Sequence, residues 1–127
     1  MIKERYCSSE VSKLLKKKGF DEPCYRWYDN NGDICAKFIN PDIPLNYLSI
    51  ERYLCPTHQM ACDWLREEKG ILIEIEHRNY DRGIFRWNVY SKQNTFPKWV
   101  GIKSDISNSY GEAIEAALKY ALENLIK

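Results

Sequence analysis

Apolar side chains recur at helical spacing shortly after the start of the chain. Val11, Leu14 and Leu15 fall on one face of a helix, and the serines just before them can cap its first backbone amides. Gly19 ends this pattern and can adopt the left-handed conformation on which many helices stop. The spacing therefore predicts a first helix from about Ser8 to Gly19.

Two further segments have the same helical period. The second runs from about Thr57 to Lys69, with Gly70 as its stop. The third begins at Ser109, whose spacing to Glu112 is that of a capping box, in which each side chain binds a backbone amide at the other's position. The residues predicted to face the core are Met60, Ala61, Trp64 and Leu65 in the second helix and Ile114, Ala117, Ala121 and Leu125 in the third.

Alternation of apolar and polar residues predicts the strands of the second half. Ile71 to His77 places isoleucines on one face and glutamates on the other. Phe85 to Tyr90 alternates in the same way after a turn that ends at Gly83. A short extended piece from Trp99 to Ile102 is a third candidate strand.

A hairpin is predicted in the first half. Tyr25 to Tyr28 and Ile34 to Ile39 are β-prone, and the Asn-Asn-Gly-Asp run between them favours a tight turn because Asn-Gly accepts positive φ. The following stretch contains Pro41 and Pro44 and leads to Leu54 as a connection to which no structure is assigned.

These elements predict an α+β fold in a single compact domain, residues 1–127, a common domain size. Three helices pack on a mainly antiparallel sheet in the order α-β-β-α-β-β-(β)-α. A single offset of the sequence against itself aligns Gly19 with Gly70 and Gly32 with Gly83. Both halves (1–50 and 55–127) then have the order helix, glycine stop, strand, turn, strand. Either the α-β-β unit is duplicated, with the last helix covering one combined sheet, or glycines at turns and helix ends recur at this interval by chance.

Charge and composition narrow the setting. The chain has 19 basic and 18 acidic residues, and this balance gives no long-range field to attract a polyanion. No segment approaches the roughly 20 apolar residues of a membrane span, and the first residues lack the apolar core of an export signal. We therefore expect a cytoplasmic protein that does not bind membranes, with its five cysteines reduced.

One cysteine–histidine cluster has the residue types of a metal site. Cys55, His58 and Cys62 follow C-x2-H-x3-C spacing, and His77 is a distant fourth donor. A closed zinc site needs four ligands, and no second cysteine or histidine pair supports one. We expect Cys62 to pack inward, His58 to be solvated, and folding to require no metal or other cofactor.

No catalytic motif is present. A cysteine nucleophile needs a lowered thiol pKa and an oriented base, and the chain has no nucleophile elbow, phosphate loop or paired-histidine motif. Glu74 and Glu76 alternate along one strand, as residues on the wet face of a sheet do. We therefore predict no catalytic residue and no enzymatic activity.

Two groups of side chains are candidates for binding. Lys13, Lys16, Lys17 and Lys18 can either contact nucleic-acid phosphates or complement the negative end of the first helix. The helix–three strands–helix order of the second half is that of the double-stranded-RNA-binding fold and resembles the partial RNase-H-like fold of HicB-type antitoxins. The last helix, however, lacks the lysines that the RNA-binding fold uses at its start. The second group is aromatic, and its candidate partner-binding residues are Tyr28, Tyr80 and Tyr90.

Three stretches of the chain resemble one uncharacterised family. They are LLKKKGFDEPC at residues 14–24, PTHQMA at 56–61 followed by WLRE at 64–67, and SYGEAIEA at 109–116, where the family usually has Glu in place of Gly111. The family consists of small proteins of prophages and mobile elements in gut bacteroidete bacteria. It has no established activity or catalytic residues, so the resemblance implies a genomic setting and transfers no site.

Three hypotheses of function remain open. The first is a non-enzymatic accessory protein of a mobile element that acts through contacts with an unidentified protein partner. The alternative is a nucleic-acid-binding module, which the near-neutral charge disfavours. The third is a small thiol- or metal-dependent activity. The sequence does not indicate the oligomeric state.

Overall fold

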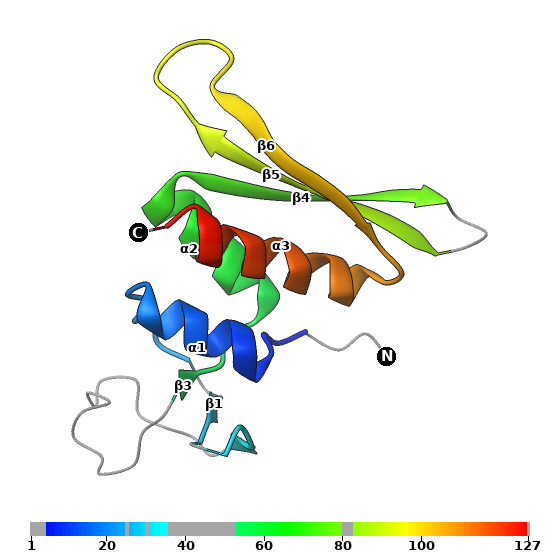
Figure 1. The fold of residues 1–127 in the computed structure, drawn as a ribbon. Helices are drawn as coiled ribbons and strands as arrows, with labels where there is room; N and C mark the ends of the chain where they lie inside the picture. Colours follow the sequence, from blue (N-terminus) through cyan, green and yellow to red (C-terminus); the bar gives the residue numbers. More distant parts are fainter. Residues whose placement is uncertain (1–4, 25, 30, 36–52, 80–82, 127) are drawn as a thin grey trace.

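The computed structural model of the chain describes residues 5–24, 26–29, 31–35, 53–79 and 83–126 (Figure 1). Within these residues, three helices combine with two antiparallel sheets, which confirms the predicted α+β class and element order. A short strand before the second helix was not predicted. The elements are α1 (Ser9–Lys17), β1 (Trp27–Tyr28), β2 (Ile34–Cys35), β3 (Tyr53–Leu54), α2 (His58–Lys69), β4 (Ile71–Asn79), β5 (Ile84–Lys92), β6 (Trp99–Ser107) and α3 (Tyr110–Asn124).

Each helix begins at a hydroxyl side chain that caps it. Ser8 Oγ accepts a hydrogen bond from the Val11 amide at 3.2 Å, and Thr57 Oγ1 accepts one from the Met60 amide at 3.1 Å. At α3, Ser109 Oγ accepts from the amide three positions on, at 3.1 Å, as the capping-box spacing predicts. The helix starts are therefore determined by local sequence.

The larger sheet has the order β4-β5-β6, and α2 and α3 lie against it. Ile73 is paired with Val89 and Ile75 with Trp87, so one face presents a continuous apolar surface to the helices. Figure 1 shows α3 running along this face, and contacts with all three strands agree with that view. The third strand is longer than the predicted piece, because it extends from Trp99 to Ser107.

The smaller sheet has the order β2-β1-β3 and is separate from the larger one. Helix α1 packs against β3 and also against α3, and Figure 1 shows it between the small sheet and α3. The alternative in which the two halves form one combined sheet is therefore wrong. All four glycines matched by the shift have positive φ, so turn and helix-stop chemistry accounts for the recurrence whether or not the halves share an origin.

The core lies between α1, α2, α3 and the inner face of the larger sheet. Of the residues predicted to face the core, Met60, Leu125, Leu14 and Ile73 are only half-buried, because each lies at the margin of the core. Predicted and fully packed residues include Trp64, Leu65, Ile114 and Ala117, joined by Leu15, Leu118 and Leu122. The buried alanines of α3 let that helix approach its neighbours closely. None of the described helices is long and apolar enough to cross a membrane.

Replacement of Gly70 tests the helix stop that orients β4 after α2. Gly70 has φ of +66°, and an added Cβ would meet only Lys92 Cβ at 3.5 Å, an ordinary contact. Gly70→Ala should therefore lose about 1 kcal/mol of unfolding free energy through backbone strain alone. Gly70→Asn is the control, because asparagine tolerates this conformation better. Urea denaturation that gives equal losses for both variants would contradict this explanation.

Candidate functional site

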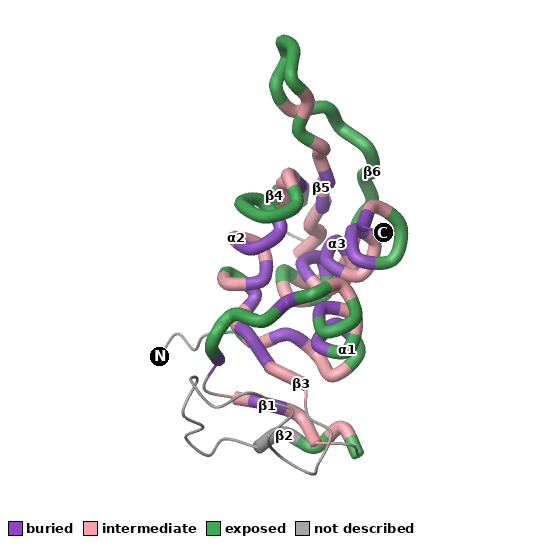
Figure 2. The backbone as a smooth tube through the Cα atoms, turned by 90° about the vertical axis from the view of Figure 1, so that its left-hand side faces the viewer, coloured by how far each residue is buried: buried purple, intermediate pink, exposed green. Residues whose placement is uncertain are grey.

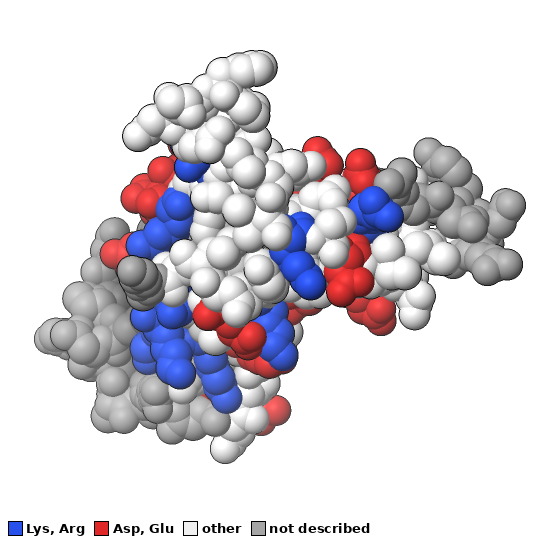
Figure 3. Space-filling model, turned by 45° about the horizontal axis from the view of Figure 1, so that its top comes forward, with Lys and Arg blue, Asp and Glu red and all other residues white. Residues whose placement is uncertain are grey.

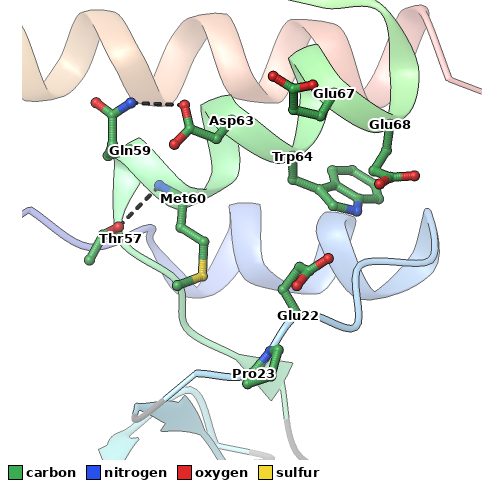
Figure 4. Close-up of a pocket in the computed structure, with 9 residues that line it drawn as sticks. All are labelled: Glu22, Pro23, Thr57, Gln59, Met60, Asp63, Trp64, Glu67 and Glu68. Atoms are coloured by element: carbon green, nitrogen blue, oxygen red, sulfur yellow. Dashed lines mark hydrogen bonds between the residues drawn. The ribbon is translucent and has the colours of Figure 1, made fainter.

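A groove beside α2 combines an apolar floor with acidic side chains. It has a volume of about 520 Å³ and is bounded by α2 and by the segment that follows α1. Figure 4 shows Met60 and Trp64 pointing from α2 toward Glu22 and Pro23. The lining residues are Glu22, Pro23, Thr57, Gln59, Met60, Asp63, Trp64, Glu67 and Glu68. We call this region the acidic groove.

The floor of the groove is packed against the core. The Trp64 side chain is buried against Phe20 in a T-shaped contact, with ring centroids 5.4 Å apart. Met60 packs against the core, and its sulfur lies 3.7 Å from Cys24 Sγ. The two segments that bound the groove are therefore held together from below.

The charge of the groove is only partly balanced. Arg66 lies 3.3 Å from Asp63 and 3.2 Å from Glu67. Among the described residues, neither Glu22 nor Glu68 forms a salt bridge. The groove thus presents carboxylates that no salt bridge of the described residues neutralises, next to an apolar surface.

A second site lies inside the molecule, where the three helices meet. One Glu115 oxygen lies 2.8 Å from both His58 Nε2 and the Ser8 amide, and the other accepts a hydrogen bond from Ser8 Oγ at 2.7 Å. Ser8 is the N-cap of α1, His58 is the first residue of α2, and Glu115 belongs to α3. We call this set the three-helix junction.

Electrostatics at the junction favour a charged Glu115. Burial alone would raise the pKa of this carboxyl, but hydrogen bonds from His58 and Ser8 outweigh that effect and lower it. With Glu115 ionised, His58 Nε2 donates a hydrogen bond to it, and Nδ1 is the other ring nitrogen. This nitrogen is buried and has no hydrogen-bond partner among the described residues. The prediction that His58 is solvated is therefore wrong, because a carboxylate distant in sequence binds it.

Cys7 brings a thiol to this junction. Its sulfur lies within 4.8 Å of donor atoms of His58 and Glu115, so sulfur, nitrogen and oxygen donors converge there. These types suit a thiophilic cation, yet three donors fall one short of a closed tetrahedral zinc site, and both Glu115 oxygens already accept hydrogen bonds. The expectation that folding needs no metal stays a prediction.

The described thiols are poor nucleophiles. Burial raises the pKa of Cys7 and Cys55, and the nearby Glu115 carboxylate raises both further. Burial also raises the pKa of Cys24 to about 12 and that of Cys62 to about 11. Because the thiolate is the reactive form, these cysteines are built for packing and not for attack. Cys62 is only half-buried, so its predicted inward packing is incomplete.

The lysines near the end of α1 divide into two groups. Lys13 and Lys16 lie 5.4 and 4.9 Å from the centroid of the Tyr53 ring, and Lys17 lines the same hollow of about 490 Å³. Lys18 instead donates a hydrogen bond to the Ile126 carbonyl at 2.8 Å. Figure 3 shows basic side chains gathered over α1 and both signs of charge elsewhere on that face.

The three tyrosines predicted as partner contacts do not form one surface. Tyr28 donates to the Cys7 carbonyl at 2.7 Å and is half-buried, so it serves the interior. Tyr90 lies on the outer face of the larger sheet and donates to Glu74 at 3.2 Å. Tyr80 lies outside the described residues.

Sequence reasoning missed both the acidic groove and the junction. The acidic residues of α2 are visible in the sequence, but nothing there indicates that Glu22 lies opposite them. Cys7, Ser8 and Glu115 carried no local signal of a shared site, because Ser8 and Glu115 are separated by 107 positions.

Comparison of the chain with protein-family models, curated proteins and solved structures finds no match. The function is therefore inferred from the geometry of the chain's own residues.

The junction should give stability a dependence on acid. Because the pKa of Glu115 is lowered in the folded chain, its contribution is fully present above its ordinary value of 4.5 and is lost as the pH falls through the folded-state value. At neutral pH, Glu115→Gln should lose about 2 kcal/mol of unfolding free energy, since it weakens three partly buried hydrogen bonds. The variant should also lose less stability than the wild type on acidification.

Glu123→Gln is the matched control, because this glutamate is exposed near the end of α3. It should change the unfolding free energy by no more than about 0.5 kcal/mol. Denaturant melts at a series of pH values would make both comparisons. Equal effects of the two substitutions would show that the junction does not stabilise the fold.

Proposed function

We propose that this protein is a non-enzymatic binding module whose acidic groove holds a basic segment of a partner protein. The observation that carries the proposal is the combination of unpaired carboxylates and an apolar, aromatic floor in one groove. The described thiols are neutral, and this supports binding over thiol chemistry. If the chain belongs to a mobile element, the partner is a protein that this element encounters.

The chemistry of lysine and arginine fits this groove. Both side chains lay an aliphatic stem along apolar surfaces while the charged end reaches polar groups. Met60 and Trp64 offer such a surface, and Glu22 and Glu68 supply the charge. A groove of about 520 Å³ lies within the range of ligand sites in proteins.

The chain itself shows how a cation interacts with the groove floor. Lys69 Nζ lies 5.4 Å from the centroid of the Trp64 ring, within the range of a cation–π contact. A partner cation can approach the same indole from the groove side. Recognition of this kind depends on charge and on an aromatic ring, so it selects basic segments over acidic ones.

Charge reversal at Glu68 tests the proposal. The probe is a fluorescent peptide of alternating lysine and leucine, with a glutamate–leucine peptide of equal length as the comparison. Glu68→Lys should weaken binding of the basic peptide about tenfold at low salt, because it replaces an attractive charge by a repulsive one. Fluorescence anisotropy would give the affinities.

Glu123→Lys is the control for net charge, because it makes the same charge change on α3, away from the groove. It should leave binding nearly unchanged. Amide NMR spectra should show peptide-induced shifts concentrated on the groove residues of α2. Equal weakening by both variants, or shifts spread over the whole surface, would refute a specific groove.

Nucleic-acid binding is a second candidate, favoured by one observation. The segment α2-β4-β5-β6-α3 has two helices on one face of a three-stranded antiparallel sheet, the element order of the double-stranded-RNA-binding fold. The candidate lysines Lys13, Lys16 and Lys17, however, lie on α1, outside this segment, and the first two lie over an aromatic ring of the chain itself.

A gel-shift titration with duplex and single-stranded probes separates the two candidates. We expect the wild type to show no salt-sensitive retention of either probe at physiological ionic strength. If retention occurs, the triple substitution Lys13→Glu, Lys16→Glu, Lys17→Glu should abolish it, since each neutralised phosphate releases counterions. Lys18 is left unchanged because it binds the Ile126 carbonyl. Tight, salt-dependent binding by the wild type would reverse our order of preference.

A further inference from the structure

Strand β6 forms an edge of the larger sheet. It is nine residues long and pairs on one side with β5, and no described strand pairs with its other side. Figure 2 shows it exposed along most of its length. An edge of this length presents a row of backbone donors and acceptors to any strand that can approach it.

The side chains of β6 are more apolar than an exposed strand requires. Val100, Ile102 and Ile106 are 37%, 43% and 57% exposed, and they are among the most exposed large hydrophobic residues that the structure describes. Only Lys103 and Asp105 carry charge in the strand. A partner for this edge must therefore match apolar residues and one charge of each sign.

A second copy of the same strand meets this requirement in one register. When two β6 strands run antiparallel with Ser104 facing Ser104, Lys103 lies opposite Asp105 of the other copy, and the same pair recurs across the dyad. Ile102 then faces Ile106. Directly opposed residues of opposite charge stabilise antiparallel pairs, as do apolar pairs.

The neighbouring registers are disfavoured by the same charges. Residues paired across the interface must lie on the same face of the joined sheet. The two strands can therefore slip only in steps that move the two-fold axis by one residue. Centring on Lys103 places two lysines face to face, and centring on Asp105 places two aspartates face to face. Like charges directly opposite each other destabilise a pair, so the charge pattern favours the Ser104 register over its two neighbours.

Two features of β6 are typical of edges protected against pairing, a β-bulge and charged side chains. The bulge lies between the partners of Val89 and Tyr90, where Ile102 is the extra residue. Asp105 Oδ1 also accepts a hydrogen bond from the Ile106 amide at 2.8 Å. These features exclude strands that lack complementary charges. In the Ser104 register the charges instead attract each other. Backbone hydrogen bonds between the two strands then replace the bond from the Ile106 amide to Asp105.

We propose that the protein forms a symmetric homodimer through antiparallel pairing of two β6 strands, centred on Ser104, so that the two larger sheets join into one. The partner is thus a second copy of this chain. The acidic groove lies beside α2, and no residue of β6 lines it. The dimer therefore does not depend on the proposed binding function.

Charge substitutions test the pairing. Sedimentation velocity from micromolar to millimolar concentration should show a monomer–dimer equilibrium for the wild type. Lys103→Asp and Asp105→Lys should each weaken the dimer about thirtyfold, because each turns two attractive pairs into repulsive ones. The double substitution K103D/D105K restores opposite charges and should restore the dimer. Thermal melts should be similar for all variants, since both side chains are exposed.

A disulfide tests the register independently. In the proposed dimer the two Ser104 residues face each other, so Ser104→Cys should form an intermolecular disulfide readily under mild oxidation. Ser107→Cys is the control, because its counterpart lies about 20 Å away in this register. A wild type that stays monomeric at millimolar concentration would overturn the proposal. So would a folded double variant that fails to recover dimerisation, or equal cross-linking at both positions.

Discussion

The fold depends on one half-buried carboxylate. Glu115 belongs to α3, yet its oxygens accept hydrogen bonds from the cap of α1 and from the first residue of α2. Withdrawing a charge from water is costly unless donors surround it, and here the N-terminal ends of two helices supply them, where the helix dipole also favours a negative charge. Apolar packing brings the helices together, but it is tolerant of small rotations. The directed hydrogen bonds at Glu115 restrict the three helices to one mutual arrangement.

The acidic groove follows from this arrangement. Helix α2 places Ala61 and Leu65 in the core, and this leaves Met60 and Trp64 at the side where the segment after α1 passes. That segment starts at the end of α1, so its distance from α2 is determined by how α1 and α2 meet at the junction. A rotation of α2 would separate Glu68 from Glu22 and open the floor. The inner polar cluster therefore determines the geometry of an outer surface without touching any ligand there.

Sequence reasoning succeeded where structure is local. Caps, glycine stops and strand alternation depend on residues a few positions apart, and Ser109 and Gly70 behave as their neighbours predict. It failed where the partner is remote. His58 is polar and begins a helix, which favours solvent, but Glu115 lies 57 positions away and buries it. The two sheets stay separate for a similar reason, since nothing within either hairpin specifies which helix it packs against. Tertiary contacts decided these features.

The separation of Ser8 from Glu115 also affects the order of events on the ribosome. Ser8 and Lys18 find their partners 107 and 108 positions later, whereas the segment from α2 to α3 is built mainly from neighbouring elements. At about 5–20 residues per second, α1 emerges several seconds before α3 exists. During that interval Val11 and Leu15 have no core to enter. The nascent chain thus carries an amphipathic segment that is open to chaperones until the last helix is made.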